Sequence, residues 1–260
     1  MFRPRVIPIL LLKNNGLVKS IKFKNYRYIG DPINAVKIFN DLRADELVFL
    51  DILATREKKT ISLDFVRRVG NEANMPFSVG GGIRTIKQIS DIIKAGAEKV
   101  VINSYAYEKP NFIKEAADEF GSSTVVVSID VNKKFLSKKQ VYTLCGSKAT
   151  GIDPVTFAKL MEDKGAGEII INSIEKDGMM TGYDFDLVKR VSKSVTIPVI
   201  AAGGVGSFKD FRLAINKFYA SAVSAGSIFV YHGPRKAVLI NYPNSKELIK
   251  IFQNEDSGRT

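Results

Sequence analysis

The sequence is short of the residues that build disulfides and metal sites. Its single cysteine, Cys145, excludes an intramolecular disulfide and fits a reducing cytoplasm. One histidine, His232, and one cysteine argue against a zinc site of nitrogen and sulfur ligands, so we expect no metal and no cofactor. No histidine lies near Cys145 in the sequence, which disfavours a nucleophilic cysteine, and we expect His232 at the surface.

Long apolar runs are also missing. No segment approaches the roughly 18–20 consecutive apolar residues that cross a membrane. The N-terminus has no small-residue cleavage site typical of a secretory signal. We therefore expect a cytoplasmic protein without membrane contact. Its 260 residues, 45% of them hydrophobic, suffice for a large core.

Acidic residues are outnumbered, with 27 Asp and Glu against 39 Lys and Arg and a net charge of +12. Such a charge attracts phosphorylated metabolites, nucleic acid or an acidic partner. The basic residues lack the interleaved aromatics of a base-stacking surface, so we expect no nucleic-acid partner. The nearest candidate, segment 19–28, is better interpreted as a mobile loop with strand-like alternation.

The second half of the chain repeats the first. Each matching pair is separated by 122 residues: Asp31-Pro32 and Asp153-Pro154, Ala44 and Ala166, Glu46 and Glu168, Pro76 and Pro198. The first strand of each half aligns after a small shift, and Leu11 then falls opposite Asp130. A carboxylate in one half and leucine in the other predict an asymmetric site.

Short β-branched runs alternate with amphipathic helical segments along the chain, and we predict eight strands at 6–12, 46–52, 77–81, 99–103, 124–130, 168–174, 199–204 and 221–227. Helices are predicted between them, for example over 31–43, 85–96 and 153–165, with Asp31 and Asp153 as N-caps. Eight such units indicate a single-domain α/β protein, a closed (β/α)₈ TIM barrel over 1–260. The repeat divides it into half-barrels of about 1–120 and 121–245. A short polar tail follows at 254–260.

Glycine-rich loops end two of these strands and lead into helices. In this fold the site lies at the carboxyl ends of the strands, where glycines let the backbone approach an anion and a helix start donates N–H groups. Each loop neighbours a small polar residue of the next strand. We predict two phosphate cups on opposite sides of the barrel mouth, the first at Gly81, Gly82, Asn103 and Ser104 and the second at Gly203, Gly204, Gly226 and Ser227. The two cups predict a long ligand with a phosphate at each end.

Carboxylates also lie at strand ends. Asp130, at the end of the fifth strand, is the candidate general acid or base. Asp51, at the end of the second strand, could orient a loop or a substrate hydroxyl. Asp177 and Gly178 favour a turn that could also close the second cup.

Four charged residues lie instead near strand beginnings: Arg5, Glu46, Lys99 and Glu168. All four should project to the bottom opening of the barrel, where two cations and two anions can form a ring of ion pairs. The charge pattern alone favours a plug that closes the barrel floor.

Together these residues resemble the cyclase subunit of imidazole glycerol phosphate synthase, an enzyme of histidine biosynthesis. The resemblance covers about residues 1–230 and is carried by DELVFLDI, FSVGGGIR, EKVVINS, SIDVNK, GAGEIIINSI, KDGMMTGYD and IAAGGVG. It implies that a glutaminase partner on the barrel floor releases ammonia from glutamine. Ammonia would then cross the barrel and attack a bisphosphorylated aminoimidazole carboxamide ribonucleotide. The products would be imidazole glycerol phosphate and the carboxamide ribotide.

The resemblance also implies residue roles. The charged ring matches the family's gate for ammonia rather than a plug, and Gly82, Asn103 and Ser104 match one phosphate site. Asp177, Gly178, Gly204, Gly226 and Ser227 match the other phosphate site. Lys19 matches a lysine on a mobile loop over the substrate, and Asp130 matches one of two catalytic aspartates.

The second catalytic aspartate of the family falls at Leu11, in LLLKNNG. Leucine cannot carry a proton, and losing one partner of a general acid–base pair typically costs about 10²–10⁴-fold in rate. This departure, and the segment VLINYPN, resemble a paralogous branch linked to surface-polysaccharide sugars. That branch implies an alternative, in which ammonia passes to a third protein, an amidotransferase that makes amidino sugars. A third alternative is a phosphosugar isomerase on the same duplicated barrel. It would need two acid–base carboxylates across the mouth, so Leu11 counts against it equally.

Overall fold

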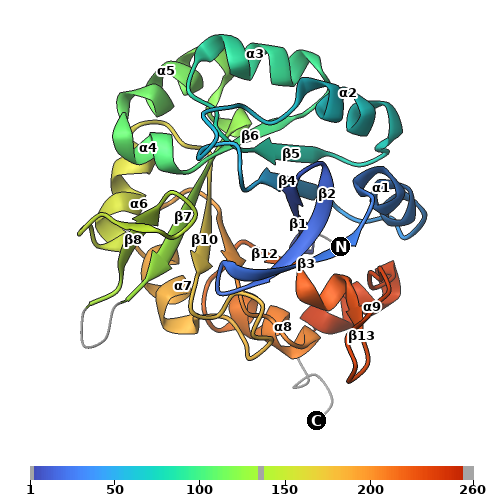
Figure 1. Ribbon diagram of the computed structural model, residues 1–260. Helices are drawn as coiled ribbons and strands as arrows, with labels where there is room; N and C mark the ends of the chain where they lie inside the picture. Colours follow the sequence, from blue (N-terminus) through green and yellow to red (C-terminus); the bar gives the residue numbers. More distant parts are fainter. Residues whose placement is uncertain (1–2, 134–137, 254–260) are drawn as a thin grey trace.

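The computed structural model describes residues 3–133 and 138–253 of the 260, so the predicted tail at 254–260 lies outside the described residues. Its centre is a closed barrel of parallel strands with helices around the outside (Figure 1). The barrel strands are β1 (Val6–Lys13), β4 (Leu47–Asp51), β5 (Phe77–Gly80), β6 (Lys99–Ile102), β7 (Val125–Asn132), β10 (Glu168–Ser173), β11 (Val199–Ala202) and β12 (Ala222–Ala225). The predicted TIM barrel, with all eight strands near their expected places, is confirmed.

The helices cover the outer face of the barrel, and α1 to α8 lie between its strands in sequence while α9 follows the last strand. They are α1 (Pro32–Asp41), α2 (Leu63–Glu72), α3 (Ile86–Lys94), α4 (Ser104–Glu108), α5 (Asn111–Phe120), α6 (Pro154–Asp163), α7 (Phe185–Ser192), α8 (Phe208–Asn216) and α9 (Ser245–Phe252), with short 3₁₀ turns η1 (Ser122–Thr124) and η2 (Ser227–Phe229). Asp31 caps α1 and Asp153 caps α6, each followed by proline at the first helical position, as predicted.

The order of strands around the barrel places β7 opposite β1, four strands away in either direction. The repeat is visible in the hydrogen bonds. Leu47 N donates to Pro76 O at 3.0 Å, and 122 residues later Ile169 N donates to Pro198 O at 2.9 Å. The two halves therefore use the same backbone contacts at the barrel floor.

Three antiparallel hairpins are added to the barrel. They are β2 (Gly16–Ile21) with β3 (Lys24–Gly30), β8 (Gln140–Thr143) with β9 (Lys148–Ala149), and β13 (Tyr231–His232) with β14 (Ala237–Val238). Segment 19–28 lies in the first hairpin, which confirms the strand-like alternation expected of it. Leu11 of β1 pairs with Val18 of β2, so the hairpin is joined to the barrel strand by antiparallel pairing.

Two apolar layers stabilise the fold. The larger lies between strands and helices and contains Phe39, Phe49, Phe112 and Phe211, all almost fully buried. The smaller fills the interior of the barrel with branched side chains and alanines: Ile7, Val48, Val101, Val126, Ile170, Ile200, Ala202 and Ala222. Within the described residues, no helix has the length and apolarity needed to span a membrane.

Candidate functional site

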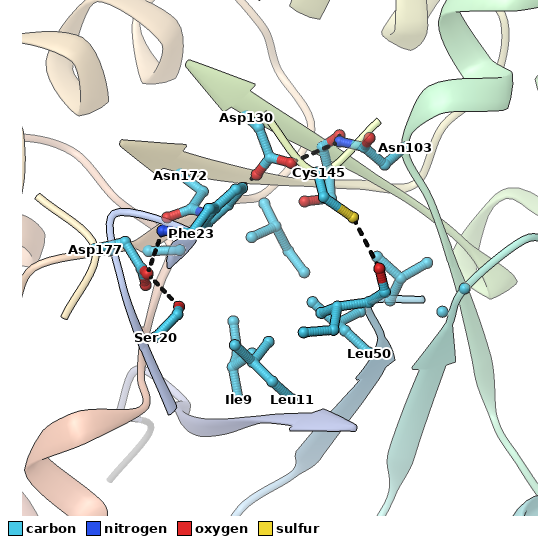
Figure 2. A pocket seen from close by; sticks show the side chains of 18 of the residues that line it. Ile9, Leu11, Ser20, Phe23, Leu50, Asn103, Asp130, Cys145, Asn172 and Asp177 are labelled. Carbon is cyan, nitrogen blue, oxygen red and sulfur yellow. Dashed lines mark hydrogen bonds between the residues drawn. The ribbon is translucent and has the colours of Figure 1, made fainter. Parts of the chain in front are cut away.

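The carboxyl ends of the barrel strands open into one cavity, shown from close by in Figure 2. It is lined by every residue that the sequence predicted for the mouth: Lys19, Asp51, Gly81, Gly82, Asn103, Ser104, Asp130, Asp177, Gly178, Gly203, Gly204, Gly226 and Ser227. Residues up to 208 positions apart in the chain therefore meet in a single site. Parallel strands bring their carboxyl ends to the same edge, so the alternation of strands and helices alone produces this convergence.

Asp130 is buried and held by two carboxamides. Asn172 Nδ2 donates to Asp130 Oδ1 at 3.0 Å, and Asn103 Nδ2 donates to Asp130 Oδ2 at 3.1 Å (Figure 2). Burial raises the pKa of Asp130 to about 7, with the charge of Asp177 adding to burial and the two carboxamide bonds opposing it. An acid with a pKa near 7 can both give and take a proton at neutral pH. The sequence did not single out Asn172.

Leu11 faces this carboxyl from the opposite strand. In the register of the sheet, Leu11 pairs with Leu50, and Asp130 pairs with Asn172. Since Asn172 lies 122 residues after Leu50, Leu11 is the structural counterpart of Asp130, as the sequence alignment predicted. Ile9, Leu11 and Leu50 form an apolar wall on the side of the cavity away from Asp130 (Figure 2).

Lys19 lies beside the second cup and is 6% exposed. Its Nζ donates to Ile9 O at 2.7 Å. Burial lowers the pKa of Lys19 to about 8, against the opposing effect of Asp177. A Cβ on Gly226 would fall 2.0 Å from Lys19 Nζ, so the absence of a side chain at Gly226 makes room for the ammonium.

Asp177 fastens the β2–β3 hairpin to the mouth. Ser20 Oγ donates to Asp177 Oδ2 at 2.7 Å, and Lys22 N donates to Asp177 O at 2.9 Å (the first bond is drawn in Figure 2). Burial raises the pKa of Asp177, and the bond from Ser20 opposes it. A Cβ on Gly178 would fall 2.1 Å from Ser20 O, so the turn meets the hairpin backbone directly. Phe23 also packs at the hairpin tip and lines the cavity.

The glycines of both cups have conformations that disfavour other residues. Gly82 has φ +67°, and a Cβ there would fall 1.7 Å from Lys59 O. Gly204 has φ +108°, and a Cβ there would fall 2.5 Å from Gly182 O. In the first cup Ser104 Oγ donates to Asn103 Oδ1 at 3.0 Å and accepts from Leu144 N at 2.9 Å. Backbone N–H groups in such loops can approach an anion closely.

Both glycine loops are followed by helices, as predicted, but these helices begin a few residues beyond the glycines. Helix α3 begins at Ile86 and α8 at Phe208, and a capping box occupies the N-terminus of each. The helical turns that begin at the cups are α4 and η2, which start at Ser104 and Ser227 without a side-chain cap. Free N–H groups at the cups therefore come from the glycine loops and these short turns.

Within the described residues, three further residues considered in the sequence have no partner among the groups around Asp130: Asp51, Cys145 and His232. Asp51 Oδ1 accepts from Leu53 N and Ala54 N, at 3.0 and 3.2 Å, so it orients the loop after β4. Cys145 lines the cavity and its Sγ donates to Ile52 O at 3.0 Å (Figure 2). Burial raises the pKa of the Cys145 thiol to about 11, which keeps it protonated and agrees with the prediction against a nucleophile. His232 is exposed, as expected.

The four charged residues near the strand beginnings form a closed ring of ion pairs. Arg5 contacts Glu46 at 2.5 Å and Glu168 at 2.6 Å. Lys99 completes the ring, 3.2 Å from Glu168 and 3.5 Å from Glu46. Burial works against the charge of Arg5, but Glu168 and Glu46 outweigh it and raise the pKa of Arg5.

The ring and the mouth are joined by the interior of the barrel. Successive inward positions pass from Arg5, just before β1, through Ile7 and Ile9 to Leu11, because side chains alternate along a strand. The layer between ring and mouth is mainly apolar, with the buried serines Ser78, Ser128 and Ser224 at its two ends. A neutral small molecule is tolerated by such a layer far better than an ion.

Known proteins are similar to this sequence along nearly its whole length. Residues 5–235 match the family described as "Histidine biosynthesis protein". A protein of Leptospira interrogans, named "Putative imidazole glycerol phosphate synthase subunit HisF", is 47% identical over 97% of this chain and 100% of its own. The imidazole glycerol phosphate synthase subunit HisF of Petrotoga mobilis is 44% identical over 89% of this chain and 92% of its own. The chain therefore belongs to the histidine biosynthesis family, among the HisF subunits of imidazole glycerol phosphate synthase.

Proposed function

We propose that this barrel is the cyclase subunit of a glutamine-dependent imidazole glycerol phosphate synthase. The observation that carries the proposal is the alignment of three features on one axis: the charged ring at the floor, the apolar interior and the polar mouth. A glutaminase subunit docked on the floor releases ammonia at the ring formed by Arg5, Glu46, Lys99 and Glu168. Ammonia is neutral and small, so the apolar layer passes it and holds back ions.

The ligand at the mouth is a small molecule with a phosphate at each end. The two glycine cups lie after β5 and β11, on opposite sides of the same cavity, which suits such a ligand. Lys19 supplies a cation at the second cup, beside Gly226. Asp130 lies between the cups, where the middle of the ligand would pass.

Asp130 and Lys19 are the two acid–base groups of this proposal, which give or take protons during the reaction. Their pKa values, about 7 and about 8, bracket the pH at which a cytoplasmic enzyme works. Ammonia attacks the bisphosphorylated aminoimidazole carboxamide ribonucleotide, which is cleaved and cyclised. Imidazole glycerol phosphate and the carboxamide ribotide leave as products.

A second function is favoured by Leu11. The wall of Ile9, Leu11 and Leu50 offers no proton donor or acceptor opposite Asp130. In this alternative the cyclase reaction has been lost, and the barrel conducts ammonia to a third protein, an amidotransferase that acts on a surface-polysaccharide sugar.

The test is turnover of the bisphosphorylated aminoimidazole substrate with ammonium salts and no partner, in the natural protein and in Leu11→Asp. Brisk turnover by the natural protein supports the cyclase and means that Lys19 or another group replaces the missing aspartate. Turnover that appears only in Leu11→Asp rejects the cyclase and favours ammonia delivery. A matched Leu12→Asp variant, buried outside the cavity, controls for the introduction of a carboxylate.

A further inference from the structure

Two of the added hairpins meet beside the mouth of the barrel. Residues of β2–β3 line the mouth cavity, and β13 begins at Tyr231, soon after the second cup. Arg27 of β3 joins the two hairpins, because its Nη1 donates to Lys236 O at 3.4 Å and its guanidinium lies 5.6 Å from the centre of the Tyr231 ring. The outer face of residues 21–28 and 231–239 thus forms one surface next to the mouth, the hairpin surface.

Large apolar side chains are exposed on the hairpin surface. Most of those exposed in the described part of the chain lie on it or beside its tip: Ile21, Tyr28, Val238 and Leu239, with Met179 directly after the turn that packs on the hairpin. Tyr28 is 66% exposed and Leu239 is 55% exposed, and neither lines the mouth cavity. A group of exposed apolar side chains of this kind marks a surface that binds another macromolecule.

The segment VLINYPN holds its apolar start outside the protein. Leu239 N donates to Val230 O at 2.9 Å, and Tyr242 Oη donates to Val6 O at 2.8 Å. Tyr242 is buried, whereas Val238 is 41% exposed. The segment is therefore anchored on both sides of its exposed residues. A partner would meet a surface that is already ordered, so docking costs little conformational entropy here.

The hairpin surface is basic as well as apolar. Residues 14–30 and 231–246 contain no aspartate or glutamate. Their exposed cations include Lys22, Lys24, Arg235 and Lys236. Within residues 3–133 and 138–253, no hydrogen bond or ion pair engages any of these four side chains. Charge complementarity therefore favours a partner whose surface is acidic around an apolar centre.

A protein suits this place better than a membrane or a nucleic acid. In the second function proposed above, ammonia leaves the barrel at the mouth and has to reach an acceptor before water protonates it. A protein that docks beside the mouth can both shield this path and carry the acceptor. A lipid surface or a nucleic acid has no group that uses ammonia.

We propose that the hairpin surface docks the third protein of the second function through an acidic patch with an apolar centre on that protein. The proposal rests on the second function and adds the surface that the delivery of ammonia requires. Tyr28, Val238 and Leu239 supply the apolar contact, and Lys24 and Lys236 pair with carboxylates of the partner. The glutaminase keeps its place on the floor, because floor and mouth are opposite ends of the barrel.

Isothermal titration calorimetry of the barrel–glutaminase complex with the purified sugar amidotransferase tests the docking. We expect Lys236→Glu to weaken binding roughly tenfold at low ionic strength and less at high ionic strength, because salt screens exposed charge pairs. Leu239→Ser should weaken binding roughly tenfold at any ionic strength, because it removes apolar contact. Binding of the glutaminase should be unchanged in both variants, which shows that the barrel is intact.

Lys159→Glu and Tyr219→Ser are the matched controls, because Lys159 is exposed on α6 and Tyr219 is 53% exposed between α8 and β12, both outside the hairpin surface. If the amidotransferase binds and Lys236→Glu and Leu239→Ser act no more strongly than these controls, the hairpin surface is rejected and ammonia delivery stands. If the amidotransferase does not bind at all, both are rejected. If the two variants weaken binding to phosphatidylglycerol vesicles but not to the amidotransferase, the surface contacts a membrane and the proposal is rejected.

Discussion

Leu50 and Asn172 occupy equivalent positions in the two halves of the barrel, yet only Asn172 can hold a carboxyl group. Leu50 pairs with Leu11, and Asn172 pairs with Asp130. One half of the mouth thus carries an apolar pair where the other carries a hydrogen-bonded polar pair. At this level of the mouth, the hydrogen-bonded polar pair therefore lies on the β7 and β10 side.

Replacing Asn172 with leucine, the residue of the other half, should raise the pKa of Asp130 further. Asn172 donates to the carboxyl and favours its ionised form, and a hydrogen bond to a charged group contributes about 1.5–3 kcal/mol, or roughly one to two pH units. Carbon-13 NMR of the Asp130 carboxyl over pH 5–9 measures the shift. Asn103→Ala, which removes the other donor, should give a smaller shift in the same direction. An unchanged or lower pKa in Asn172→Leu would contradict this role.

The stability of the protein should fall as the pH rises from about 4 to about 7. The pKa of Asp130 is raised from 3.8 to about 7 in the folded state, so over this range the unfolded chain loses a proton that the folded protein keeps. The loss is on the order of 4 kcal/mol, because each pH unit corresponds to about 1.4 kcal/mol. Above about pH 7 the contribution is constant.

Urea unfolding at several pH values measures this slope. Asp130→Asn removes the titration while keeping the size of the side chain, so the variant should be less sensitive to pH between 4 and 7 than the natural protein. Asp51→Asn, at the other strand-end aspartate, is the control and should keep the slope. Identical slopes in the natural protein and Asp130→Asn would show that Asp130 is not the group responsible.

Lys19 should make phosphate binding sensitive to alkaline pH. Its lowered pKa of about 8 means that the ammonium loses its proton between pH 7 and pH 9, and with it the charge at the second cup. We expect the affinity for inorganic phosphate to fall across this range and expect Lys19→Gln to remove that part of the dependence. Gly226→Ala should also weaken binding, because its Cβ would displace Lys19 Nζ. Calorimetric titrations at pH 7 and pH 9 measure both effects, and an equal fall with pH in Lys19→Gln would reject the assignment.

Much of the site could be predicted from the sequence, because a residue at the carboxyl end of any barrel strand lies at the mouth of the barrel. Gly82, Asn103, Asp130 and Gly204 each end or follow a strand, and this alone places them at the mouth. The same logic placed Arg5 and its three partners at the floor. Asn172 was missed because its role depends on pairing with Asp130 in a neighbouring strand.

The hairpin over the mouth was harder to predict. β2 and β3 pair with two interruptions of register, and Asp177, 157 residues away from Ser20, fastens the tip. Local alternation around Lys19 and Phe23 carries no information about that contact. For the same reason, the sequence could assign Lys19 to a loop over the site but could not foresee that its ammonium is buried against Ile9.

The ring at the floor should couple glutamine hydrolysis to use of ammonia at the mouth. Arg5 bridges Glu46 and Glu168, so Arg5→Ala should open the ring and let ammonia escape before it enters the barrel. In a complex reconstituted with a glutaminase subunit, we expect less product per glutamine hydrolysed, while turnover with added ammonium salts is unchanged. Arg3→Ala is the matched control, because Arg3 pairs with Asp45 at 2.6 Å at the same end of β1, outside the ring. It should cost stability of about 1–3 kcal/mol without changing the ratio. Equal ratios in Arg5→Ala and Arg3→Ala would mean that the ring closes the floor without controlling the passage of ammonia.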